Sequence, residues 1–248
     1  MPTKIKLLFI VLQVVSTSCF AQGLDSTSKT GHLSGSASLT NNGISLVPLF
    51  SLEKPAAVFD MSLSKSNFSF DPELAFSTDG HPWYLLLWLH YKIAHRGKFK
   101  LTAGTHLGLN YTNGVVWSGG DSSKVTVVQR YIVGNLVPSY SISENISVGV
   151  YYLFSHGLDA GTANAIHFLT LNANFSHVKL GGKFYMKMIP QLYYLKIDHE
   201  DGFYFAGSLT LARDNFPLSV STLINKVVKT NIGVGQNFTS NVSLTYSL

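Results

Sequence analysis

The last stretch of the chain constrains the fold most strongly, because its alternation runs to the final residue. From Val242 to Leu248 every second residue is apolar, and Ser243, Thr245 and Ser247 stand between them. Successive side chains of a strand point to opposite faces, so this strand has one apolar face and one polar face. An unpaired edge strand promotes aggregation. We therefore expect this strand to pair with the first strand of the same sheet and close a barrel.

The composition favours a barrel that faces lipid. Charged residues make up 12% of the 248 residues, whereas soluble domains carry about 25%, and the mean hydropathy is +0.19. Outside residues 7–15 the longest unbroken apolar run is Trp83 to Leu89, and a membrane-spanning helix needs about 20 apolar residues. The sequence therefore excludes a helical membrane protein. Its apolar residues are spread in alternation, as a membrane-facing barrel requires.

The amino terminus has the features of a secretory signal peptide. Lys4 and Lys6 supply the positive charge, residues 7–15 form a short apolar segment, and Ala21 is a small residue at a cleavage position. We expect residues 1–21 to be removed during export.

Between the signal peptide and the barrel the sequence is less regular. Residues 22–42 are read as a polar leader that contains an uncertain element at 32–40, which could be a periplasmic segment, a plug of the lumen or an extra strand. The barrel is expected to span residues 43–248. Lipid attachment at Cys19 is an alternative to simple cleavage, but Ser16 stands where such a signal has leucine.

Twelve strands are expected in the barrel. They span about 43–51, 56–64, 67–77, 83–95, 98–111, 124–138, 145–156, 165–176, 178–195, 203–212, 217–227 and 236–248. The turns on one side are mostly short, at 65–66, 96–97, 139–144, 176–177 and 213–216. The connections on the other side are mostly longer, at 52–55, 78–82, 112–123, 157–164, 198–202 and 228–235. An even count with short periplasmic turns and longer extracellular loops is typical of outer-membrane barrels, and it places both termini in the periplasm.

The signal peptide, the two-residue period and the apolar last strand resemble Gram-negative outer-membrane β-barrel proteins. In that class the last strand is the assembly signal and usually ends in an aromatic residue. Here Leu248 is last and Tyr246 stands two residues earlier. The pair Ala21-Gln22 and the run from Asn42 to Pro48 further resemble uncharacterised barrels of Bacteroidota-type bacteria. The resemblance implies location in the bacterial outer membrane, lipid as a partner and recognition of the last strand by the barrel-assembly machinery, but it implies no activity.

A basic inner face is the strongest candidate site. Charge on the lipid face costs about 2–4 kcal/mol at the bilayer midplane, so charges opposite the apolar face are expected to point into the lumen. The expected set comprises Lys98, Lys100, His106, Arg130, Lys179, Lys183 and Lys187, together with Asp71 and Glu73. Such a ladder would attract a small anionic solute, and the two carboxylates would set a transverse field. The alternative is a lumen filled by paired charges.

Catalytic and metal sites find little support in the sequence. His156 and His167 flank one loop, but a third ligand is not evident and no His-Glu-x-x-His motif is present. A lipid hydrolase at the rim needs a serine within hydrogen-bonding reach of a histidine. Ser155 and His156, with Asp159 nearby, are adjacent on a strand and therefore point to opposite faces. We expect no metal, no cofactor and no enzymatic activity.

The functional expectation is a narrow channel or binding barrel for small, anionic solutes. Nucleic acid is not expected as a partner, because the sequence has no Walker A loop, zinc-finger spacing or RNP-like motif. Aromatic residues near strand ends suggest a girdle at the two membrane interfaces or, alternatively, a platform for sugars; they are Trp83, Tyr91, Tyr111, Tyr152, Tyr194 and Tyr246. The competing classes are a closed structural or adhesion barrel that acts through loops such as 112–123 and 157–164, and a lipid hydrolase at the rim.

Overall fold

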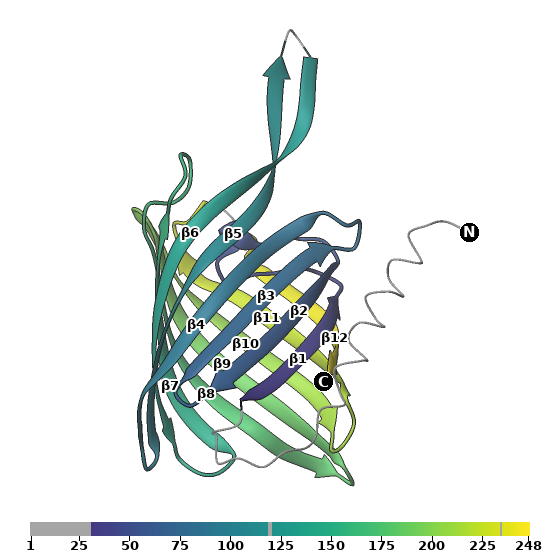
Figure 1. The fold of residues 1–248 in the computed structure, drawn as a ribbon, viewed down its shortest axis with the longest axis vertical. Helices are drawn as coiled ribbons and strands as arrows, with labels where there is room; N and C mark the ends of the chain where they lie inside the picture. Colours follow the sequence, from purple (N-terminus) through teal and green to yellow (C-terminus); the bar gives the residue numbers. More distant parts are fainter. Residues whose placement is uncertain (1–30, 119–120, 234) are drawn as a thin grey trace, which may run out of the picture. The chain divides into compact units, whose positions relative to one another are not determined.

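Twelve antiparallel strands of the computed structural model close into a barrel (Figure 1). The structure describes residues 31–118, 121–233 and 235–248, so the expected signal peptide lies outside the described residues. The strands are β1 (His32–Thr40), β2 (Ala56–Lys65), β3 (Phe68–Ser77), β4 (Pro82–Arg96), β5 (Phe99–Ser118), β6 (Asp121–Ser141), β7 (Ile146–Gly157), β8 (Ile166–Gly181), β9 (Phe184–Ile197), β10 (Glu200–Arg213), β11 (Leu218–Thr230) and β12 (Phe238–Ser247). Each pairs with its neighbours in sequence, and β1 pairs with β12. The prediction of a closed twelve-stranded barrel is confirmed.

The outer surface of the barrel is apolar. On β10, for example, Phe203, Phe205 and Leu209 are exposed, whereas Tyr204 and Ala206 between them are buried. This arrangement follows from the two-residue period of a strand, because the exposed set faces outward and the buried set faces the lumen. Within the described ranges, no helix has the length and apolar character needed to cross a bilayer.

The barrel begins earlier in the chain than the sequence predicted. Residues 32–40 form β1, and the strand predicted at 43–51 is wrong: this segment contains a short 3-10 helix, η1 (Pro48–Phe50). Leu33 and Leu39 alternate with small residues and are 62% and 58% exposed on the outer face. Pro48 lacks the backbone N–H that a central strand needs. One strand thus replaces another, and the count stays at twelve.

The connection between β1 and β2, residues 41–55, folds inward, and we call it the inner loop. The indole Nε1 of Trp83 donates a hydrogen bond to the carbonyl oxygen of Phe50 at 2.8 Å. The amide of Gly43 bonds to the carbonyl of Lys54 at 2.7 Å. A Cβ atom at Gly43 would lie 2.9 Å from the Trp83 ring, so a larger residue here would displace the loop. Trp83 was expected in the outer girdle, but a register shift between β3 and β4 at Ala75 turns it inward, and it is 5% exposed.

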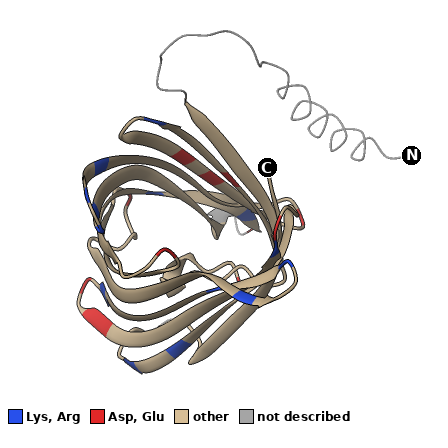
Figure 2. Cartoon of the chain, turned by 90° about the horizontal axis from the view of Figure 1, so that it is seen from below, with Lys and Arg blue, Asp and Glu red and all other residues tan. Residues whose placement is uncertain are grey.

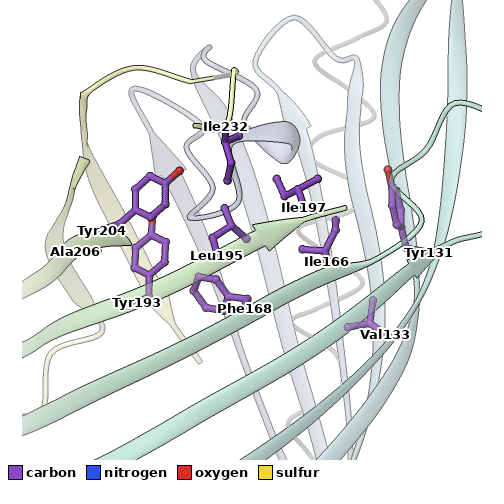
Figure 3. Close-up of a cluster of buried hydrophobic side chains, with 10 residues drawn as sticks. All are labelled: Tyr131, Val133, Ile166, Phe168, Tyr193, Leu195, Ile197, Tyr204, Ala206 and Ile232. Atoms are coloured by element: carbon purple, nitrogen blue, oxygen red, sulfur yellow. The ribbon is translucent and has the colours of Figure 1, made fainter. Parts of the chain in front are cut away.

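Apolar side chains from β6, β8, β9 and β10 fill part of the lumen beneath the inner loop (Figure 3). The buried cluster consists of Tyr131, Val133, Ile166, Phe168, Tyr193, Leu195, Ile197, Tyr204, Ala206 and Ile232. Leu46, Val47 and Phe50 of the inner loop pack against it. The barrel therefore has an apolar outer surface and also an apolar region inside, which alternation alone does not predict.

Three predicted connections are wrong because the strands continue into them. One is 198–202, where β9 reaches Ile197 and β10 begins at Glu200. β5 extends to Ser118 and β6 begins at Asp121. Most of the predicted loop 112–123 is therefore part of a hairpin that rises beyond the barrel (Figure 1). β8 continues past the predicted turn at 176–177 to Gly181, because register shifts after Phe175 let the strand absorb the irregular residues. We call the barrel end with turns 66–67, 97–98, 142–145, 182–183 and 214–217 the turn end. Its connections are mostly shorter than those at the other end, which favours a periplasmic position for it.

Candidate functional site

The lysines expected to line the lumen gather at the turn end. Lys98 and Lys183 lie in the turns 97–98 and 182–183, and Lys98 Nζ donates a hydrogen bond to the carbonyl of Ile142 at 3.3 Å. The remaining three lysines lie on inward-facing positions within four residues of a turn; they are Lys100 on β5, Lys179 on β8 and Lys187 on β9. These residues form a basic rim at one mouth of the barrel and do not form a ladder along its interior.

Arg130 points outward, whereas the sequence predicted that it points into the lumen. Its neighbours Tyr131 and Val133 are buried in the lumen in alternation with exposed Ile132, so Arg130 lies on the outer face of β6. Its guanidinium forms an ion pair with Asp159 in the connection between β7 and β8, with Nη2 and Oδ1 2.5 Å apart. The pKa of Asp159 is lowered because Arg130 donates hydrogen bonds to its carboxylate. The alternation of β6 sets this outward face. The pairing of β6 with β7 ends at Tyr131, so Arg130 lies close to the rim, where charge can reach water.

His106 lies in the interior, on the inward face of β5, and is 7% exposed. Its ring centroid is 4.0 Å from that of Trp88, and Trp88 stacks on His90 at 5.0 Å with an interplanar angle of 11°. Gly104 and Gly108, two residues before and after His106, leave space for these rings, because a Cβ atom at either would lie within 3 Å of an imidazole atom. The glycine–histidine–glycine spacing on one face of β5 thus accommodates Trp88 between two imidazoles, stacked on His90 and tilted by 53° against His106.

Asp71 projects inward from β3 and accepts three hydrogen bonds. The donors are Ser62 Oγ at 2.5 Å, Ser69 Oγ at 2.7 Å and His90 Nδ1 at 2.7 Å. The β2–β3 pairing omits the positions around Pro72, which is the local irregularity expected of a proline in a strand. The interruption lies where Ser62 reaches across to the carboxylate.

Glu73 occupies the next inward position on β3. Tyr84 of β4 donates a hydrogen bond to it, and Asp60 of β2 is its direct cross-strand partner. Asp60 accepts a hydrogen bond from Ser36 at 2.9 Å. Three carboxylates therefore share the inner wall formed by β2 and β3; the acidic segments on these neighbouring strands can be followed in Figure 2.

A cavity of about 270 Å³ lies between the inner loop and the inner faces of β4, β5, β6 and β7, and Glu73 of β3 also lines it. Its aromatic lining is contributed by Phe50, Trp83, Tyr84, Trp88 and Tyr131, and its polar lining by Ser45, Glu73, His106, Asn110 and Ser155. His106 Nδ1 and Ser155 Oγ are buried and have no hydrogen-bond partner. We call this cavity the aromatic pocket. Buried polar atoms are usually paired, so two unpartnered ones in one cavity indicate a site that a ligand can complete.

Sequence reasoning found part of this pocket and missed the rest. It placed His106 and Glu73 on the inner face, and it showed that the centre of β4 is an unbroken apolar run. It did not recognise that Trp88 on the polar face of β4 builds an internal aromatic wall. The glycine spacing around His106 was the available signal. The inward fold of the inner loop left no comparable pattern.

The alternative catalytic and metal groups do not assemble in the described part of the chain. Ser155 is buried in the lumen, whereas His156 is exposed and its Nδ1 lies 2.5 Å from the carbonyl oxygen of Asn164. His167 Nδ1 lies 2.9 Å from the hydroxyl of Tyr152 on the outer face. No group of three or more metal-ligating side chains is found among the described residues.

A solved porin shares the fold of this chain. The KdgM porin in complex with disordered oligogalacturonate has a TM-score of 0.53 at 10% identity, over 88% of this chain and 99% of that chain. LpxR from Salmonella typhimurium has a TM-score of 0.49 at 10% identity, over 86% and 99% of the two chains. The NanC porin has a TM-score of 0.48 at 10% identity, over 87% and 98%. No protein-family model and no curated protein matches the chain.

Closed barrels with an apolar outer face satisfy every backbone hydrogen bond within lipid, which an open sheet does not. The chain therefore has the fold of outer-membrane β-barrel proteins, and the bacterial outer membrane is the location that this fold and its outer face indicate.

Proposed function

We propose that the barrel is a narrow passage for small solutes, in which the aromatic pocket holds a solute before it moves on. The observation that carries the proposal is the cavity of about 270 Å³ with two unpartnered polar atoms in its lining. Ligand sites are generally concave and mostly apolar, with a few convergent polar groups. The aromatic pocket has these features.

The inner loop is the element that would control access. It packs on the buried cluster through Leu46, Val47 and Phe50, and it is held by the Trp83 hydrogen bond and by the hydroxyl of Tyr193, which donates to the carbonyl of Leu46 at 3.1 Å. In this proposal the loop narrows the lumen at the end opposite to the turns.

The basic rim has a secondary role in the proposal. Lys100, Lys179 and Lys187 would adjust the local ion concentration at the periplasmic mouth, while the groups nearest the held solute would set its charge preference. Changing Lys187 to Glu should shift the reversal potential in a salt gradient toward cations. The same change at Lys183, which lies in a turn, should shift it less. Equal shifts would contradict the assignment of Lys187 to the lumen mouth.

The experiment that tests the passage itself is conductance of the refolded barrel in a planar bilayer. Discrete steps are expected, and replacing residues 44–51 by glycine and serine of equal length should enlarge them. The matched control replaces residues 158–163 in the same way, in a connection that does not line the aromatic pocket. If the wild-type barrel and the loop variant are both silent although folded, as judged by heat modifiability, the passage is refuted.

A closed adhesion barrel is the second candidate, and one observation favours it. The β5–β6 hairpin rises beyond the rest of the barrel (Figure 1), where it could contact a partner outside the cell. Silence in both bilayer experiments would favour this candidate.

A further inference from the structure

We propose that the aromatic pocket selects a small organic ammonium ion that carries one ring. The inference rests on the proposed function, because the solute has to enter the lumen. It reverses the charge preference expected from the lysines, and three independent features of the pocket support it.

Uncompensated negative charge is the first feature. Glu73 lines the pocket and lies directly opposite Asp60 in the β2–β3 ladder, and like charges at such positions repel each other. Within the described ranges, neither carboxylate has a lysine, arginine or histidine within ion-pair distance; Asp71 alone of this wall has one, His90. A bound cation would relieve this repulsion.

The aromatic lining is the second feature. Phe50, Trp83, Tyr84, Trp88 and Tyr131 surround the cavity. The faces of aromatic rings attract cations, and the attraction grows when water is excluded. The same rings provide apolar contact for the body of the ligand. An anion would instead be repelled by both the ring faces and the Glu73 carboxylate.

Hydrogen-bonding capacity is the third feature. His106 Nδ1 and Ser155 Oγ are unpartnered and belong to side chains that are 7% and 2% exposed. Both atoms can accept a hydrogen bond, and a primary ammonium group has three N–H donors. The volume of about 270 Å³ lies below the range of roughly 300–1,000 Å³ for sites of drug-sized ligands. A molecule with a single ring fits this size.

The test compares three probes of the same shape and different charge: 2-phenylethylammonium, 2-phenylethanol and phenylacetate. Their binding to the folded barrel in detergent would be measured by isothermal titration calorimetry. We expect phenylethylammonium to bind at least about tenfold more tightly than the other two, because charge-assisted hydrogen bonds exceed neutral ones in strength. Equal affinity for the three probes, or preference for phenylacetate, would overturn the inference.

Two variants locate the binding. Glu73→Gln keeps the shape of the side chain and should abolish the preference for the ammonium probe, whereas Glu144→Gln, the same change in an exposed turn at 142–145, should leave it intact. Ser155→Ala should weaken the ammonium probe several-fold. Unchanged preference in folded Glu73→Gln would also overturn the inference.

Failure of this inference can be separated from failure of the proposed function. If the barrel conducts but shows no preference for the ammonium probe, the proposed passage is supported and the proposed ligand class is refuted. If the barrel binds the ammonium probe but never conducts, the proposed ligand class is supported and the proposed passage is refuted.

Discussion

The two inner walls beneath the inner loop differ in how completely their polar groups are satisfied. On the β9–β11 side, which we call the tyrosine wall, the rings of Tyr193 and Tyr204 stack at 4.8 Å with an angle of 6°. The Tyr193 hydroxyl lies 2.9 Å from Asn225 Oδ1, and the Tyr204 hydroxyl lies 2.8 Å from Thr230 Oγ1. On the opposite side, the aromatic pocket contains a cavity and the unpartnered His106 Nδ1 and Ser155 Oγ.

This difference separates a structural wall from a binding wall. A buried hydroxyl with a partner contributes to stability, whereas an orphaned one costs the free energy of its lost hydration. The tyrosine wall also reaches the inner loop through Leu46, so it fixes the loop in place. The aromatic pocket leaves space and unused hydrogen-bonding capacity under the same loop. Substitutions on the tyrosine wall should therefore mainly change stability, and substitutions in the aromatic pocket should mainly change ligand binding.

The largest effect is expected from Tyr193→Ala on the tyrosine wall. The ring is 2% exposed and contacts Phe168 and Tyr204, so its removal should lower the free energy of unfolding by about 3–5 kcal/mol. Denaturant unfolding in detergent measures this. Tyr194→Ala, at the next residue on the outer face, is the control and should lose about 1 kcal/mol. Similar losses at the two positions would mean that the tyrosine wall has no special structural role.

A smaller loss is expected from Gly104→Ala behind the imidazole–indole stack. The new Cβ atom would lie 2.7 Å from both His90 Nε2 and Asn135 Oδ1, which requires these groups to move and should cost about 1–3 kcal/mol. Gly134→Ala on the adjacent strand is the matched control, because the nearest atom to its Cβ would be 3.9 Å away. Its unfolding free energy should stay within about 0.5 kcal/mol of wild type. The order of these two variants in unfolding experiments checks the packing around His90.

The sequence predicts the barrel well and its interior poorly, for a physical reason. Lipid imposes one rule on every outward residue, so Phe203, Leu209 and Leu211 reveal their face by alternation. The lumen imposes no such rule, since it accepts both Trp88 and Asp71. Arg130 shows where prediction by alternation fails. Its face depends on which residues of β6 point outward, and its charge is tolerated on the outer face because it lies near the rim.

The contrast between paired and orphaned hydroxyls has a direct test in two conservative changes. Tyr193→Phe removes a hydroxyl that has partners and should lower the free energy of unfolding by about 1 kcal/mol. Ser155→Ala removes one that has none, so stability should be unchanged or higher by up to about 1 kcal/mol. Unfolding of both variants under the same conditions compares the walls directly. A loss at Ser155 equal to that at Tyr193 would show that the serine is already satisfied in the protein, which would remove one support for a ligand in the pocket.

The smallest effect lies outside both walls, at the ion pair between Arg130 and Asp159. The pKa of Asp159 is lowered from its ordinary 3.8, first of all by the hydrogen bond from Arg130. A lowered pKa means that the pair contributes in full above about pH 4 and that its contribution is lost as the pH falls through the folded-state value. Cleavage of the connection 158–165 by pepsin should therefore rise between about pH 4 and pH 2, while the barrel stays folded. In Asp159→Asn, which cannot titrate, the excess of cleavage over wild type should be largest near pH 4 and should shrink toward pH 2. A constant difference across this range would mean that the ion pair does not hold the connection.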